Sequence, residues 1–316
     1  MEPSDIERGS SATGIVEARL RICANPVFVV GAPRSGTTIM ARSLAKHSHF
    51  WTSDESQILW DLFEGERLGK NYSRDGSADG SWLCKQQISR EQFLGFVGFG
   101  LNGLFTSRSQ GKRWVDQTPV YVMLAHNLIH MFPGCLIVHI LRDGRSVVHS
   151  MIHYVTGRYA GGRVPDAVKN SPQPEWATDF RTACRWWRRF VTVALDFQAS
   201  HPARCLTVRH DQLVADPTGG FREILHFLKA PLEDGPAEYF RTTRIASSFP
   251  HVPGSKYEVQ RPSRPWLDWT PEQRDIFVEE AGPAMARCGF DLEPEFLRSE
   301  AAGDGAPITP PQSVTD

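Results

Sequence analysis

A turn rich in glycine and hydroxyl side chains is the strongest chemical signal in the sequence. Its residues are Gly31-Ala32-Pro33-Arg34-Ser35-Gly36-Thr37-Thr38. The turn follows an apolar run and precedes an expected helix, where backbone N–H groups and the positive end of the helix dipole converge on an anion. Ser35, Thr37 and Thr38 add hydroxyl donors. Gly36 permits a close approach and Arg34 adds a fixed positive charge, so the turn predicts a phosphate-binding loop.

The loop differs from that of a nucleotide triphosphatase. The pattern GxxxxGKS/T places a lysine on the terminal phosphates and a hydroxyl on magnesium. Thr37 stands in the position of that lysine. A magnesium–triphosphate site is therefore disfavoured, and a P-loop kinase-like phosphotransferase remains only as the alternative enzyme class. The purely structural interpretation is a Gly-Ser turn between a strand and a helix.

A second anion-binding pattern follows the apolar run at 135–141. It reads Arg142-Asp143-Gly144-Arg145-Ser146-Val147-Val148-His149-Ser150. Arg142, at the strand end, can make a bidentate, charge-assisted contact with a phosphate. Ser150 lies two turns into the next expected helix, where its hydroxyl can donate from the same side. A solvated turn is the alternative, but the pairing with the first loop favours a second phosphate site.

Together these residues resemble the sulfotransferases that use 3′-phosphoadenosine 5′-phosphosulfate (PAPS). In that family a PxSGTT loop holds the 5′-phosphosulfate, and residues 33–38 match it. A strand-end arginine and a later serine hold the 3′-phosphate, as Arg142 and Ser150 would. A DKTP-like turn (116–119) lies between the two signatures. The arginines of both patterns look most like the tyrosylprotein sulfotransferase branch and its bacterial relatives, over about residues 26–295.

The resemblance implies a PAPS-dependent sulfotransferase that transfers a sulfuryl group in line to an acceptor hydroxyl and releases PAP. Such a reaction needs donors on the leaving phosphate and a base for the hydroxyl, with no obligatory metal. Arg34 is the expected leaving-group stabiliser. Glu55 aligns with the base of the tyrosylprotein branch, with Asp54 as the alternative, and a base would need a pKa raised by partial burial. Otherwise Glu55 is a surface or helix-capping carboxylate.

Three positions depart from the family or match it loosely. Gln117 replaces the lysine of the DKTP-like turn and keeps only a hydrogen-bonding role in catalysis. The alternatives are that another cation substitutes, with Lys112 and Arg113 close in sequence, and that the chain is a catalytically decayed PAP-binding protein. His210 replaces a tyrosine and would contact the nucleotide, unless it is a core or surface histidine. Arg261 matches a basic residue over the 3′-phosphate, with an exposed loop arginine as the alternative.

The elements that position these residues alternate between strand and helix. The expected strands are 27–30, 135–141 and 205–208, and the expected helices are 37–46, 58–63, 120–130, 144–154, 176–200 and 221–228. This order predicts an α/β fold in which helices cover both faces of a parallel sheet, similar to P-loop NTPases.

The chain is expected to form a single domain. We place this domain at residues 21–298, between disordered ends at 1–20 and 299–316. Residues 69–81 and 157–174 are rich in loop-forming residues, so they are candidate loops over the acceptor.

The charge balance and apolar content of the chain limit the classes of partner that we expect. The chain has 35 basic and 36 acidic residues and a net charge of -1, which disfavours nucleic acid as a partner. No run approaches the ~18 apolar residues of a membrane span, and the N-terminal residues are polar, so we expect a cytoplasmic protein.

The expected acceptor is a small molecule from bacterial natural product biosynthesis, a lipid or a sugar, and a homodimer is left open.

Cysteine and histidine patterns predict no metal site. The 6 cysteines are scattered without a CxxC pair and are expected to be buried thiols. The pairs His126/His130 and His149/His153 have the helical spacing of zinc ligands but lack a third ligand nearby.

Overall fold

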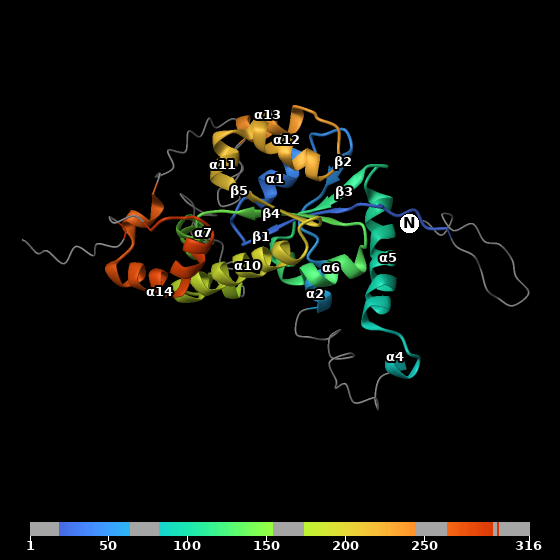
Figure 1. Cartoon of the computed structure of the whole chain (residues 1–316), viewed down its shortest axis with the longest axis horizontal. Coiled ribbons are helices and arrows are strands. Elements are labelled where there is room, and N and C mark those ends of the chain that lie inside the picture. The colour runs from blue at the N-terminus through green and yellow to red at the C-terminus, as the bar shows by residue number, and fades with distance from the viewer. Residues whose placement is uncertain (1–18, 64–81, 154–173, 244–263, 293–295, 297–316) are drawn as a thin grey trace, which may run out of the picture.

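A five-stranded parallel sheet forms the centre of the protein (Figure 1). The structure is a computed structural model of the 316-residue chain that describes residues 19–63, 82–153, 174–243, 264–292 and Phe296. The strands are β1 (Val27–Gly31), β2 (Phe50–Thr52), β3 (Arg113–Asp116), β4 (Leu136–Leu141) and β5 (Cys205–Arg209). They lie in the order β2-β3-β1-β4-β5.

The two central strands explain why both expected phosphate signatures meet. Strands β1 and β4 are buried throughout and are apolar except for His139 of β4, as is typical of a parallel sheet covered on both faces. They pair in register from Val27 with Leu136 to Gly31 with Ile140. Both strands therefore end at the same edge of the sheet, and the segments that follow them begin side by side.

One face of the sheet is covered by four helices, which lie above the strands in Figure 1. They are α1 (Thr37–Leu44), α11 (His210–Ala215), α12 (Pro217–Phe227) and α13 (Gly235–Thr242). Val27 and Val29 of β1 pack there with Met40 and Leu44 of α1 and with Phe221 of α12.

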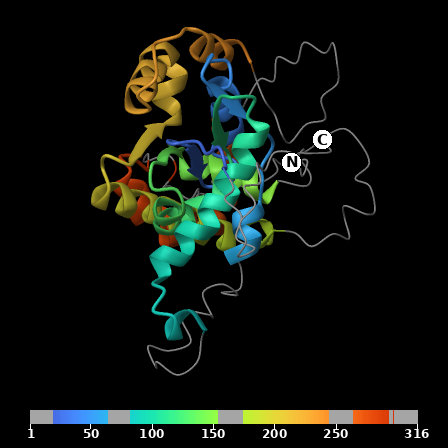
Figure 2. The ribbon, with the colours of Figure 1, turned by 90° about the vertical axis from the view of Figure 1, so that its right-hand side faces the viewer.

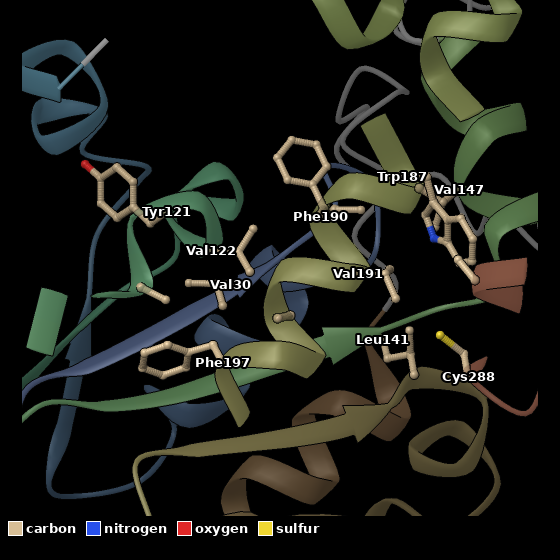
Figure 3. Close-up of a cluster of buried hydrophobic side chains, with 14 of the residues drawn as sticks. Val30, Tyr121, Val122, Leu141, Val147, Trp187, Phe190, Val191, Phe197 and Cys288 are labelled. Carbon is tan, nitrogen blue, oxygen red and sulfur yellow. The ribbon is translucent and has the colours of Figure 1, made fainter. Parts of the chain in front are cut away.

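The opposite face carries a larger core around helix α10 (Phe180–Ser200) (Figure 3). Val30 and Leu141 of the sheet pack with Trp187, Phe190 and Phe197 of α10. Further helices that contribute to this core include α5 (Arg90–Arg108), α6 (Ala125–Met131), α7 (Gly144–Ile152) and α14 (Pro271–Arg287). The perpendicular view shows helices on both sides of the sheet (Figure 2), which confirms the predicted α/β class.

Shorter helical segments complete the described part. They are α2 (Ile58–Phe63), α4 (Trp82–Lys85) and the 3-10 turns η3 (Pro119–Leu124), η4 (Glu175–Ala177) and η5 (Pro265–Asp268). Among the described helices, none is long and apolar enough to cross a membrane.

Several predicted boundaries need correction. The helix expected over 120–130 is a 3-10 turn followed by α6, and Pro119 stands at the start of that turn. The helix expected from residue 176 starts at Phe180, because Asp179 is extended and its carboxylate caps the backbone of Thr182. Strands β2 and β3 and helices α4, α5, α11, α13 and α14 were not predicted. The single domain over 21–298 stays a prediction.

Candidate active site

The first loop leaves β1 and ends at the N-terminus of α1. Gly36 is the residue before the helix and has a φ of 107°, a left-handed conformation that favours glycine. A Cβ atom there would also lie 3.0 Å from Cδ2 of His210. The loop therefore requires glycine at this position, and His210 lies directly against it.

Polar groups of this loop are left for a ligand. Among the described residues, no side chain caps the N-terminus of α1. The Ser35 side chain is buried, and within the described residues its hydroxyl has no hydrogen-bond partner. Thr37 is buried at the first helical position and Thr38 follows it, half-buried. An uncapped helix N-terminus with an unpartnered hydroxyl suits a bound anion.

Arg34 joins this loop to the second signature. Its φ is 75°, unusual for a residue with a side chain. The Nε atom of Arg34 donates a hydrogen bond of 3.1 Å to Oγ of Ser150. The backbone carbonyl oxygen of Arg34 accepts a hydrogen bond of 3.2 Å from Nη1 of Arg142. The fold therefore brings together Arg34, Arg142 and Ser150, as the sequence predicts.

The N-terminus of α7 is held by a close contact with α10. A Cβ atom on Gly144 would lie 2.8 Å from the buried ring of Trp187, so only glycine fits there. The indole Nε1 of Trp187 donates a hydrogen bond of 3.3 Å to the carbonyl oxygen of Arg142. Trp187 thus fixes the turn that carries Arg142.

The second arginine of this motif is turned into the protein. Arg145 is only 4% exposed, and its guanidinium forms an ion pair of 2.7 Å with Asp143. It also stacks over the ring of Trp266, 4.3 Å from the ring centre. Asp143 caps α7 by accepting a 2.8 Å bond from the backbone N–H of Arg145. These contacts give Arg145 a structural role.

Glu55 lies on the segment between β2 and α2. The residue is exposed at the surface, and Nε2 of Gln57 donates to its carboxylate at 2.7 Å. Neighbouring protein desolvates the carboxylate and raises its pKa; Gln57 lowers it, Asp116 raises it and Arg34 lowers it. The net shift is upward, as expected of a base near neutral pH. Asp54 is exposed and lies 3.7 Å from Arg42.

Gln117 follows β3 and is buried. Its Nε2 donates a hydrogen bond of 3.3 Å to the carbonyl oxygen of Ser53, two residues before Glu55. Its Oε1 has no partner among the described residues. The amide therefore contacts the segment that carries the expected base.

Neither Lys112 nor Arg113 can replace the family lysine, which corrects one sequence-based interpretation. Arg113 is the first residue of β3, whereas Gln117 follows its last residue, so the two lie at opposite edges of the sheet. Its guanidinium donates to the carbonyl oxygen of Leu228 at 2.6 Å and to that of Asn25. Arg113 therefore ties the start of β3 to the segment before β1 and to the end of α12, at the opposite end of β3 from Gln117.

Of the remaining predicted residues, the structure describes His210 but not Arg261. His210 begins α11 and lies between Gly36 and the ring of Phe240, whose centre is 6.2 Å from its own. Arg261 lies outside the described residues, as do residues 69–81 and 157–173. Five cysteines are described as free thiols, and four of them are buried.

Sequence reasoning missed a polar network beside Glu55. The hydroxyl of Ser56 lies 2.6 Å from the carboxylate of Asp116 and 2.9 Å from the hydroxyl of Tyr121. Asp116 was part of the DKTP-like turn, but nothing in the sequence linked it to Ser56, 60 residues away.

Comparisons with known proteins identify the family of this chain and several relatives. The model of the sulfotransferase family matches residues 26–234. Protein-tyrosine sulfotransferase A of Caenorhabditis elegans is 23% identical over 280 residues, covering 84% of this chain and 67% of its own. Protein-tyrosine sulfotransferase 1 of Danio rerio is 25% identical over 276 residues, covering 84% of this chain and 72% of its own. A solved sulfotransferase from Alicyclobacillus acidocaldarius aligns with a TM-score of 0.46 at 14% identity, covering 87% of this chain and 99% of its own.

The chain belongs to the sulfotransferase family. This result confirms the predicted enzyme class, a PAPS-dependent sulfotransferase, and the resemblance to the tyrosylprotein branch.

Proposed function

We propose that this enzyme transfers the sulfuryl group of PAPS to the hydroxyl of a small molecule. The observation that carries the proposal is the contact of Arg34 with Ser150 and Arg142, because it joins a 5′-phosphosulfate loop to a 3′-phosphate site. Two anion sites at adjacent strand ends suit a nucleotide with phosphates on both sides of its ribose.

The residues present fit PAPS. Within the part of the chain that the structure describes, the Ser35 hydroxyl has no partner and the α1 N-terminus has no side-chain cap, so both offer donors for the 5′-phosphosulfate. We assign Ser35, Gly36, Thr37 and Thr38 to that end. Arg142, Ser150 and Arg261 are assigned to the 3′-phosphate, and His210 to a nucleotide contact beside the loop. PAPS supplies the sulfuryl group, and no metal is required in this proposal.

Three side chains are assigned to the chemistry. Glu55 accepts the proton of the acceptor hydroxyl while the oxygen of that hydroxyl forms a bond to sulfur. The raised pKa of Glu55 favours this role. Arg34 stabilises the negative charge that develops on the phosphate oxygen as the old sulfur–oxygen bond breaks. Gln117 acts through a hydrogen bond, since it carries no charge.

The acceptor is proposed to be a natural product, lipid or sugar. The relatives' names make a tyrosine-containing peptide the second acceptor to test. Identities of 23% and 25% leave room for a different acceptor on the same fold. The cytoplasmic location and the homodimer stay predictions.

An acceptor screen with PAPS tests the proposal. We expect one class of hydroxyl compound to gain the mass of one SO3 group, with PAP formed in equal amount. Glu55→Gln and Arg34→Ala should each abolish most of this turnover, whereas the exposed α12 variants Glu223→Gln and Arg222→Ala should retain it. Transfer only to tyrosine peptides would overturn the small-molecule assignment.

The alternatives give different outcomes. A kinase-like enzyme would need ATP and magnesium, against which the threonine at position 37 argues. A decayed nucleotide-binding protein would bind PAP but transfer nothing to any acceptor. PAP binding together with SO3 transfer is expected only of the sulfotransferase.

A further inference from the structure

We propose that Tyr121, Ser56 and Asp116 form a hydrogen-bonded relay that positions Glu55, which makes them positioning residues for the transfer reaction. The inference rests on the proposed function, because it assumes that Glu55 is the base. Figure 3 shows Tyr121 on the core side of the sheet, at the edge of the large apolar cluster.

The direction of each hydrogen bond in the relay follows from the number of protons available. The backbone N–H of Leu59 donates to the hydroxyl of Tyr121 at 2.9 Å. Ser56 has one hydroxyl proton, which the 2.6 Å contact with the carboxylate of Asp116 requires. Tyr121 must therefore donate to Ser56 across the 2.9 Å contact between their hydroxyls. The backbone N–H of Thr118 completes the relay by donating to the other Asp116 oxygen at 2.8 Å.

The relay also caps a helix. Leu59 is the second residue of α2, and its N–H is one of the first four of the helix, which have no partner within it. The Tyr121 hydroxyl satisfies this N–H from a different element. Helix α2 is thereby fixed relative to the carboxyl end of β3, and Glu55 lies just before that helix.

A second set of contacts holds the other side of Glu55. The hydroxyl of Thr52 donates to the carbonyl oxygen of Val115 at 2.9 Å. Gln117 donates to the carbonyl oxygen of Ser53 at 3.3 Å. Glu55 is thus bracketed by contacts to the last residues of β3 and the residue after them.

Burial makes the loss of any one hydrogen bond in the relay costly in free energy. Tyr121 is fully buried, and Asp116 is 8% exposed. A buried polar group that loses its partner costs more than the bond itself contributed, so each member depends on the others. Gln57 adopts a φ of 55° between the relay and α2, a conformation that the surrounding contacts must hold.

The charges around Glu55 indicate what loosening would do. Asp116 faces it from β3, Arg34 from the loop before α1, and Asp54 from its own segment. Desolvation is the largest cause of its raised pKa. If the segment moved away from the neighbouring protein it would lose this effect, so the pKa of Glu55 would fall.

The test uses Tyr121→Phe and Ser56→Ala in the full chain. Turnover is measured with saturating PAPS and acceptor. It is divided by the number of PAP-binding sites counted by calorimetry, so that a loss of folded protein does not lower the kcat obtained. We expect a ten- to hundred-fold fall in kcat for each variant with the affinity for PAP unchanged, since small displacements of a reacting group have effects of this size. The acid limb of the pH profile should move to lower pH.

The control is Val122→Ala, which removes buried apolar atoms from the same 3-10 turn without touching the relay. It should reduce stability but keep kcat per site. The double variant Tyr121→Phe/Ser56→Ala should lose about as much as either single variant, because one relay is broken only once.

The outcomes separate this inference from the proposed function. A wild-type chain that transfers no SO3 group overturns the proposed function and the inference with it. A wild-type chain that is active, with kcat and pH profile unchanged in both relay variants, overturns the inference alone. Equal losses in the relay variants and in Val122→Ala also overturn it, since the relay would then be structural only.

Discussion

The Nε atom of Arg34 donates a 3.1 Å hydrogen bond to Oγ of Ser150, although the two residues are 116 positions apart in the sequence. This contact joins the loop after β1 to the helix after β4. It exists because β1 and β4 are adjacent parallel strands in register, so both end at one edge of the sheet. The two expected ends of one nucleotide site therefore meet through a single pair of side chains.

Arg142 should recognise the 3′-phosphate specifically. Arg142→Ala is expected to weaken PAP binding about ten- to hundred-fold, the usual loss for a charge-assisted hydrogen bond. Binding of adenosine 5′-monophosphate, which lacks the 3′-phosphate, should change much less. Calorimetry with both ligands measures the difference, and an equal loss for both would contradict this assignment.

The pH dependence of turnover should report the environment of Glu55. A base works only when deprotonated, so activity rises as the pH passes upward through its pKa. Because the pKa of Glu55 is raised, the acid limb should lie above the ordinary range of a glutamate. Gln57→Ala removes a hydrogen bond that lowers this pKa, so the acid limb should move to still higher pH.

Two measurements check this prediction. The kcat/KM profile of Gln57→Ala is compared with that of wild type, and Glu55→Gln should lack the acid limb. An acid limb that persists in Glu55→Gln would assign it to another group.

Gly144→Ala should damage both stability and nucleotide binding. The new methyl group would lie 2.8 Å from the Trp187 ring, which is fully buried and held in the core. Overpacking of this kind costs about 1–3 kcal/mol of unfolding free energy. It should also displace the turn that carries Arg142 and thus weaken PAP binding.

Gly100→Ala is the matched control, because a Cβ atom at this helical position meets nothing within 4 Å. It should raise the free energy of unfolding by about 0.5–1 kcal/mol, since alanine is the better helix former. Urea denaturation measures both variants. Equal effects of the two substitutions would show that Trp187 can move aside.

Residue His139 should make the fold sensitive to mild acid. It is fully buried in β4, where desolvation lowers its pKa to about 3, and its Nδ1 lies 3.0 Å from the Thr207 hydroxyl. The unfolded chain takes up a proton near the ordinary value, whereas the folded chain does so only near the lowered one. The contribution of neutral His139 to the free energy of unfolding is therefore fully present above the ordinary pKa of a histidine. It is lost as the pH falls below that value toward the lowered pKa of the folded protein.

Urea denaturation at pH 7.5 and pH 5.0 should show this loss as about 2 kcal/mol attributable to His139. The variant His139→Gln, which cannot titrate, should lose less stability over the same interval. The same loss in both proteins would mean that other groups cause it.

The sequence predicted the parts of the fold whose signals are local. Residues 27–46 and 135–152 show an apolar run, a turn and a periodic helix, and the structure has β1, α1, β4 and α7 there. Arg142 and Ser150 could be paired because their spacing lies within one strand–helix unit. Strands β2 and β3 have three and four residues, too few for a recognisable pattern. Helix α5 is apolar around most of its surface and lacks a clear periodicity.

The missed features depend on contacts between distant segments. Gln117 reads in the sequence as a lost lysine, and only the fold shows that its amide holds Ser53. Arg113 is near Gln117 in sequence, yet a strand of four residues separates them to opposite edges of the sheet. Ser56 and Tyr121 carry no motif, and their roles follow from the meeting of α2 with the turn after β3.

A calorimetric titration of the wild-type chain with PAP and with ATP, both in EDTA, tests the central claim most directly. The account predicts that PAP binds at one site per chain and more tightly than ATP without any metal, because Arg142 and Ser150 are placed for a 3′-phosphate. Absence of PAP binding, or tighter binding of ATP, would contradict it.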